Sequence, residues 1–129
     1  MGSKTKRALL LVAHGSRRAA SNDEIRELAK RLAQSQANPF DLVAPAFLEL
    51  AEPSIPDGIE ACIQQGMSEV VVFPYFLSAG RHVAQDIPAE VKIKQDQHPD
   101  IVIRIADYLG TAAGMSGMIF DHLSGQSQA

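Results

Sequence analysis

The sequence has almost no cysteine and no long apolar segment, and each absence excludes a class of protein. Cys62 is the one cysteine among 129 residues, which excludes an intrachain disulfide and a cysteine-rich zinc module. This usage is typical of a reducing compartment, and we expect a cytoplasmic protein. The longest apolar run covers residues 8–13, far short of the roughly 20 residues that span a bilayer, so no membrane partner is expected. No signal peptide is expected, because no long apolar segment follows the basic residues 1–7.

The sequence also lacks the features of nucleic-acid and nucleotide binding. Its 12 basic and 15 acidic residues give a net charge of −3, which disfavours a nucleic-acid partner. Neither G-x-x-x-x-G-K-[S/T] nor G-x-G-x-x-G is present, so no nucleotide cofactor is expected. A hydrophobic fraction of 46% over this length is sufficient for one core. We therefore predict one domain over residues 1–129, with frayed ends at 1–7 and 124–129.

Strand-like and helix-like segments alternate along the chain. Apolar and β-branched runs predict strands at residues 9–13, 41–48, 69–73 and 101–105. Helical spacing predicts a helix after each strand, the last over residues 112–123. This order predicts an α/β fold with a four-stranded parallel sheet and helices on both faces.

Local signals predict where several elements begin and end. Pro45 predicts that the second strand lies at an edge or is interrupted, and Gly66 ends the second helix. Residues 74–85 are expected to be non-helical. The expected helix starts, in chain order, are a Ser21–Glu24 capping box, an N-cap at Ser54 and an N-cap at Asp86.

Polar residues follow three of the predicted strands, at the edge where ligands bind in parallel sheets. The first strand leads into His14, Glu49 follows the second, and the loop after the third contains His82. Two imidazoles and a carboxylate are therefore expected to meet at one edge. This ligand set suits Zn, Co, Fe or Ni ions, and a histidine can also accept protons near neutral pH.

Each polar residue at this edge also has an ordinary structural explanation. A histidine after a strand commonly caps a helix or forms a local hydrogen bond, and Glu49 alone suits a solvated carboxylate. Three arginines lie in the same loops: Arg17, Arg18 and Arg81. They are either solvated or bind an anionic ligand, because guanidinium groups match carboxylates and phosphates.

The other candidate residues are apolar or lie away from these loops. Tyr75 and Phe76 either belong to the core or line a pocket for a flat ring. We expect His98 and His122 to be ordinary surface residues. Cys62 suits a buried helix position, and no chemistry is assigned to it.

Four sequence blocks together resemble the sirohydrochlorin chelatases, the class II chelatases that insert cobalt or iron into a tetrapyrrole. The resemblance covers about residues 8–110 and is most specific in the third block. The blocks are LVAHGSR at 11–17, FLE at 47–49 followed by PS at 53–54, FPYFLSAGRHV at 73–83, and DIP at 86–88. The histidine-rich tract of some members is missing.

The resemblance implies a chelatase-like α/β fold, in which two such domains surround one cleft. Long members carry both domains in one chain, whereas the short form pairs as a homodimer, and a homodimer is therefore implied here. By motif match, His14 and His82 bind the metal and accept pyrrole protons during ATP-independent insertion. The implied substrates are sirohydrochlorin, in cobalamin or sirohaem biosynthesis, and a divalent ion, Co²⁺, Fe²⁺ or Ni²⁺. The residues implied to contact the tetrapyrrole are Ser16, Arg17, Arg18, Glu49, Tyr75, Phe76, Ser78, Gly80 and Arg81.

Two other functions are compatible with the residues. A non-catalytic metal or tetrapyrrole carrier on the same fold would bind its ligand without accelerating insertion. A histidine phosphatase is suggested by residues 12–15, which loosely resemble its strand-end Arg-His-Gly motif. However, Ala13 stands where the phosphate-binding arginine is expected.

Overall fold

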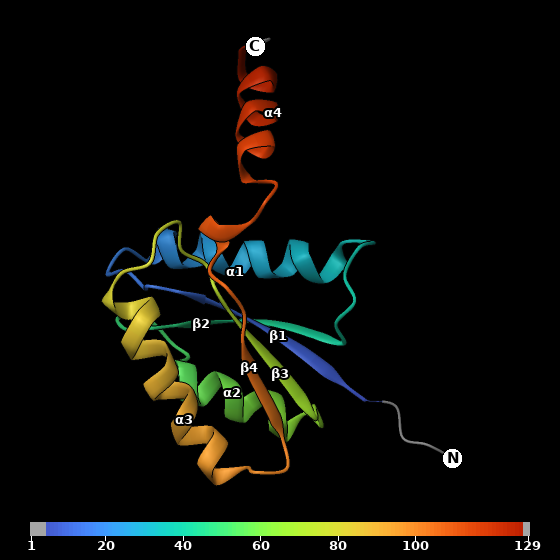
Figure 1. Ribbon diagram of the computed structural model, residues 1–129, viewed down its shortest axis with the longest axis vertical. Helices are drawn as coiled ribbons and strands as arrows, with labels where there is room; N and C mark the ends of the chain where they lie inside the picture. The colour runs from blue at the N-terminus through green and yellow to red at the C-terminus, as the bar shows by residue number, and fades with distance from the viewer. Residues whose placement is uncertain (1–4, 128–129) are drawn as a thin grey trace.

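The structure is a computed structural model that describes residues 5–127 (Figure 1). Strands and helices alternate as predicted, and two short helical turns, η1 and η2, join them. The elements are β1 (Arg7–Ala13), α1 (Ala19–Gln34), β2 (Leu42–Phe47), α2 (Ile55–Gln64), β3 (Glu69–Pro74), η1 (His82–Asp86), α3 (Ile87–Gln97), β4 (Val102–Ile105), η2 (Leu109–Thr111) and α4 (Met115–Ser127).

The four strands form one parallel sheet in the order β2-β1-β3-β4, which confirms the predicted fold class. The continuous apolar sequence of β1 suits its central position, where both neighbours pair with it. Pro45 lies in β2 at the edge of the sheet, as predicted. An edge strand tolerates proline because one side of its backbone has no ladder partner to which an N–H would donate.

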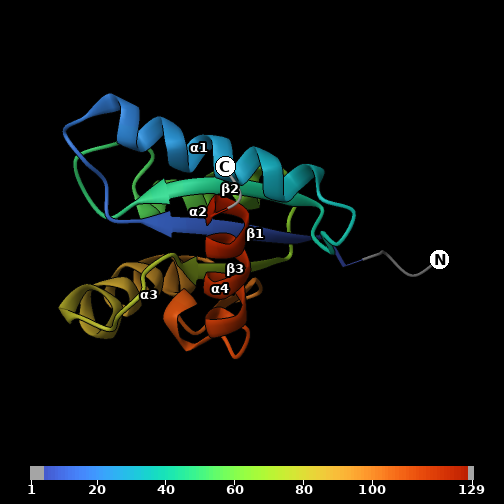
Figure 2. The ribbon, with the colours of Figure 1, turned by 90° about the horizontal axis from the view of Figure 1, so that it is seen from above.

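The helices lie on both faces of the sheet, so that prediction is confirmed. In Figure 1, α1 lies above the strands and α2 and α3 lie below them; Figure 2, seen from above, has α4 in front of the strands. The main core lies between the sheet and the pair α2 and α3. Its buried residues are Ala8, Leu10, Val12, Ala46, Ile55, Ile59, Cys62, Met67, Val70, Val72, Ile87 and Val91. On the other face α1 packs mainly over β2, whereas α4 extends away from the sheet (Figure 1).

The predicted helix starts agree with the structure for α2 and α3 and differ for α1. Ser54 is the N-cap of α2, since its Oγ accepts a hydrogen bond from the Asp57 N–H at 3.2 Å. The Ser21–Glu24 capping box does not form, because α1 has already begun at Ala19. Asp86 occupies the N-cap position of α3 and Pro88 lies in the first turn, as predicted. The Asp86 side chain forms no capping hydrogen bond, and its backbone is already helical, with φ −73° and ψ −42°.

The chain ahead of Asp86 also differs from the prediction. Residues 82–86 form the π-helical turn η1 and run directly into α3, so the stretch 74–85 is not wholly non-helical. Gly66 ends the second helical segment with φ +92°, as expected of a glycine stop.

The expected frayed ends lie only partly within the described residues. Residues 1–4 and 128–129 are outside them. Arg7 is the first residue of β1, and residues 124–127 belong to α4. Between residues 5 and 127, no helix has both the length and the hydropathy to cross a bilayer.

Candidate functional site

The structure brings His14 and Glu49 together at the carboxyl edge of the sheet. His14 follows β1, and Glu49 follows the neighbouring strand β2. The ladder between these strands continues past their ends, since the Glu49 N–H donates to the His14 carbonyl at 3.1 Å. The His14 Nε2 lies 2.7 Å from Glu49 Oε2, and the two side chains are 44% and 52% exposed. An imidazole and a carboxylate therefore form a pair that solvent can reach.

A glycine permits this close approach of the two loops. Gly15 has φ +96°, and a Cβ built on it would lie 1.7 Å from the Glu49 carbonyl oxygen. Residues with a side chain rarely adopt this backbone conformation, and none fits this space. On the other side of the contact, Leu50 also has a positive φ, of 66°.

Asn22 holds the loop that carries His14, and the sequence analysis missed it. The Asn22 side chain is 7% exposed and bonds both backbone groups of Ser16. Its Oδ1 accepts from the Ser16 N–H at 2.9 Å, and its Nδ2 donates to the Ser16 carbonyl at 2.7 Å. The sequence did contain one indication: Asn22 is polar, yet its helical spacing to Ile25 and Ala29 places it on the side of the helix that faces the sheet.

Arg26 similarly braces the loop after β2 and was also missed. Its Nη2 donates to the Glu52 carbonyl at 3.0 Å, and its Nη1 pairs with Asp23 at 2.9 Å. The guanidinium carbon lies 5.2 Å from the centroid of the Phe47 ring. Helix α1 thereby contacts both loops that carry the His14–Glu49 pair.

The remaining candidates of the first loop are oriented toward solvent. Arg17 and Arg18 are exposed. Ser16 is half-buried, and its Oγ accepts a hydrogen bond from the Arg18 N–H at 3.0 Å. Two exposed cationic residues thus follow His14 in the same loop, on a chain of net negative charge.

The third loop begins at the same edge, beside β1. The Tyr75 N–H donates to the Val12 carbonyl at 2.8 Å, and its side chain is 37% exposed. Phe76 is half-buried and packs against the core. Ser78, Gly80 and Arg81 are exposed. His82 starts η1 immediately after them, but its side chain is outside the described part of the structure.

Two further carboxylates, those of Asp86 and Glu90, line a pocket together with Glu49. A shallow pocket of about 330 Å³ is lined by Leu48, Glu49, Asp86, Ala89 and Glu90. Among the side chains that the structure describes, no three of histidine, cysteine, aspartate and glutamate are grouped closely enough to hold a metal ion. His14 and Glu49 are the two of these residue types that the carboxyl edge brings into direct contact.

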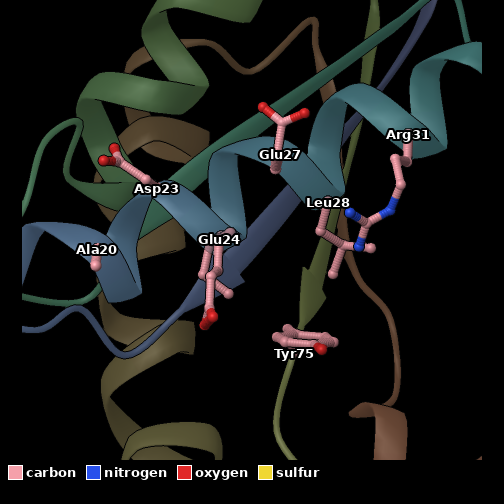
Figure 3. A pocket seen from close by; sticks show the side chains of 8 residues that line it. Ala20, Asp23, Glu24, Glu27, Leu28, Arg31 and Tyr75 are labelled. Carbon is pink, nitrogen blue, oxygen red and sulfur yellow. The ribbon is translucent and has the colours of Figure 1, made fainter.

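A larger pocket runs along α1 and ends at Tyr75 (Figure 3). We call it the α1 groove; its volume is about 640 Å³. In Figure 3 the side chains of Glu24, Leu28 and Arg31 extend from α1 toward the Tyr75 ring. The lining residues are Ala20, Asp23, Glu24, Ile25, Glu27, Leu28, Arg31 and Tyr75. The groove does not include His14 or Glu49, so size alone does not identify the site.

Away from this edge, His98 is not the ordinary surface residue that was expected. Its Nε2 lies 2.8 Å from Glu60 Oε1, and the Lys94 Nζ donates to the same oxygen at 3.0 Å. Hydrogen bonds from Gln64, His98 and Lys94 lower the pKa of Glu60 to about 2. This cluster joins α2 to the end of α3. Cys62 is buried as predicted, and burial raises the pKa of its thiol to about 11.

Fold and site together define a class of protein. It is a parallel α/β protein whose carboxyl sheet edge presents an imidazole and a carboxylate, the ligand types of divalent transition metals. The chain belongs to the CbiX family, whose model matches residues 8–125. This match confirms the family resemblance seen in the sequence.

Comparison with individual proteins gives the same family. The chain is 47% identical over 81 residues to the chloroplastic sirohydrochlorin ferrochelatase of Arabidopsis thaliana, covering 63% of this chain and 35% of that protein. A CbiX protein of Marinobacter aquaeolei VT8 superposes with a TM-score of 0.78 at 31% identity, covering 95% of this chain and 98% of that one. The sirohydrochlorin chelatase SirB of Bacillus subtilis subspecies spizizenii, solved with cobalt, gives 0.80 at 30% identity, covering 94% and 51%. The matched region spans between 32% and 62% of the curated relatives' own length.

Proposed function

We propose that this protein inserts Co²⁺ or Fe²⁺ into sirohydrochlorin without ATP. The observation that carries the proposal is the 2.7 Å contact between His14 and Glu49 at the carboxyl edge of a CbiX-family sheet. Relatives with the same fold carry the names sirohydrochlorin ferrochelatase, sirohydrochlorin cobaltochelatase and sirohydrochlorin chelatase. Nickel shares the same ligand preferences and is tested as a third metal substrate.

The pair has the chemistry that metal insertion needs. The incoming ion must exchange water for ligands, and an imidazole and a carboxylate held together supply two. Two pyrrole N–H protons must leave as the metal enters. His14 can accept a proton, and Glu49 then stabilises the imidazolium through a charge-assisted hydrogen bond. We assign the second imidazole to His82, which begins η1 on the other side of β1.

The arginines at this edge can bind the carboxylates around the substrate. Sirohydrochlorin is a flat macrocycle that carries carboxylates around its edge. Arg17, Arg18 and Arg81 are exposed in the loops that flank the pair, and guanidinium groups bind carboxylates with two parallel hydrogen bonds. The Tyr75 ring, 37% exposed in the third loop, offers a surface for the macrocycle.

We further propose that the protein acts as a homodimer in the cytoplasm. The SirB structure is matched over 51% of its chain, so one copy of this chain corresponds to about half of that protein. A second copy would supply the other wall of the substrate cleft. The single cysteine is free and buried, which supports a reducing compartment.

The test is anaerobic incubation with sirohydrochlorin and Co²⁺, Fe²⁺ or Ni²⁺, following absorbance against a control without protein. General acid–base groups contribute about 100-fold or more, so His14→Ala and Glu49→Gln are each expected to slow insertion by that factor. The matched control is His98→Ala, which removes a histidine from the opposite edge of the sheet. Full activity of His14→Ala would refute the proposal. Tight binding of metal or tetrapyrrole without acceleration by the wild type would instead identify a carrier.

A further inference from the structure

Helix α4 carries apolar side chains that nothing in the described chain covers. Every side chain from residue 116 to 126 is exposed. The largest of them are Met118 (53% exposed), Ile119 (47%), Phe120 (68%) and Leu123 (52%). Figure 1 shows the helix leaving the sheet with no other element beside it. A lone helix of 13 residues that contains Gly117 and Gly125 is marginally stable in water, so α4 needs a surface to pack on.

Part of one face of the sheet is apolar and has no helix packed on it. On the side opposite α2 and α3, α1 packs mainly over β2 and leaves β3 and β4 open. We define the open sheet face by Leu9, Val71, Phe73 and Val102. The first three are half-buried and Val102 is 51% exposed. Arg104 lies on the same face, where its charge is paired with Glu69.

The dimensions of the two surfaces match. A helix of 13 residues is about 20 Å long, and a strand of six residues extends for about the same distance. The α1 groove, which Leu28 and Tyr75 help to line, reaches the end of β3 at Tyr75 (Figure 3). One chain therefore carries both an apolar helix and an apolar surface that would accept it.

We infer that α4 of one copy packs on the open sheet face of a second copy, and that the second copy returns the same contact. The inference rests on the homodimer in the proposed function and names its interface. Such a reciprocal contact is closed, so it gives a dimer rather than a filament. The half-length match to SirB favours a second copy of this chain over another kind of partner.

The connection to α4 favours exchange between copies. The Gly110 N–H donates to the Phe76 carbonyl at 3.0 Å, and a Cβ on Gly110 would lie 1.9 Å from the Leu77 carbonyl oxygen. This contact fixes η2 to the third loop. From there, Met115 N–H donates to the Ala112 carbonyl at 3.1 Å, so the short link to α4 is itself hydrogen-bonded. The link directs α4 away from its own sheet, and short, constrained links of this kind favour exchange of an element between protomers.

The exposed area of the chain is consistent with a missing partner. The chain exposes 8180 Å², whereas a compact monomer of this length exposes about 6,700 Å². A standard interface buries about 800 Å² on each partner, and obligate dimers bury more. The excess is therefore of the size that a stable dimer needs.

Cysteine cross-linking tests this contact in the full chain. We would introduce Ile119→Cys on α4 and Val102→Cys on the open sheet face, in separate chains. The two variants are unfolded together in urea and refolded as a mixture, so that mixed dimers can form, and a short bis-maleimide is then added. Cys62 is buried, so it does not compete for the reagent. Ile93→Cys replaces Val102→Cys in the control, because Ile93 on α3 is 47% exposed, as is Ile119. We expect a covalent dimer from the mixture and none from the control.

Each other outcome overturns the inference. A dimer from Ile119→Cys alone would show that α4 pairs with α4. Cross-linking only within a chain that carries both cysteines would show that α4 folds onto its own sheet. No cross-link, whether sedimentation finds a monomer or a dimer, would also refute the contact. Insertion by the wild-type protein is measured in parallel, so an active protein without this contact leaves the proposed function intact.

Discussion

Replacing Gly15 with alanine tests whether close packing of the two loops forms the site. The new Cβ would lie 1.7 Å from the Glu49 carbonyl oxygen, whereas real contacts of this kind are essentially never shorter than 3.0 Å. The difference between these two distances means that the loops must move apart by more than 1 Å. This displacement strains the backbone bond from Glu49 N–H to the His14 carbonyl and the 2.7 Å contact of the side chains.

The chain offers a matched control in Gly66. Gly66 has φ +92°, close to the +96° of Gly15, but a Cβ built on it meets no atom within 4 Å. Gly66→Ala therefore carries only the cost of the left-handed backbone, about 1–2 kcal/mol. Gly15→Ala adds overpacking, about 1–3 kcal/mol, and a weakened hydrogen bond, about 1 kcal/mol. We expect a loss of about 3–6 kcal/mol for Gly15→Ala.

Urea unfolding at pH 7 measures both losses, and sirohydrochlorin metallation measures the effect on the site. A misplacement of about 1 Å can cost about 100-fold in rate, so Gly15→Ala is expected to be nearly inactive while Gly66→Ala retains wild-type activity. Equal destabilisation of the two variants would show that the Glu49 carbonyl moves away from the new Cβ at little cost in free energy. The reasoning from the close approach would then be wrong.

Three further predictions concern Asn22, Glu60 and Cys62. Asn22→Ala leaves the Ser16 N–H without its buried acceptor, and the urea midpoint is expected to fall by an amount equivalent to about 1–3 kcal/mol. The pKa of Glu60 is lowered from 4.5 to about 2, so its stabilisation is complete above pH 4.5 and is lost as the pH falls toward 2. The free energy of unfolding should therefore change less with pH in this range for Glu60→Gln than for the wild type. An unchanged pH dependence would contradict the assignment. The Cys62 thiol, with a pKa of about 11, should not react with Ellman's reagent at pH 8 until the protein is unfolded.

The sheet was predictable because its signals are local and independent. The apolar run of β1, the valines of β3 and the proline of β2 each indicate strand type and position without knowledge of the others. The meeting of His14 and Glu49 followed from the alternation, since consecutive parallel strands end at the same edge.

The features that were not predicted depend on contacts between distant residues. The Ser21–Glu24 pattern fits a capping box, but α1 begins earlier, where Asn22 binds the loop ahead of it. The turn η1 has no distinctive periodicity, so its join to α3 could not be seen in the sequence. The sequence predicted a helix at the position of α4, but it carried no information about which surface covers the apolar side chains of that helix.

Because the sheet is parallel, one set of loops lies at the edge opposite the candidate site. All four strands run in one direction, so the connections at residues 35–41, 65–68 and 98–101 lie at the amino edge, opposite His14 and Glu49. Insertions in exposed loops are tolerated well when their backbone is not needed elsewhere. Residues 35–37, which are exposed, therefore offer an attachment point for a fluorophore or a surface tether. A label attached there would not contact the carboxyl edge of the sheet, where His14 and Glu49 lie.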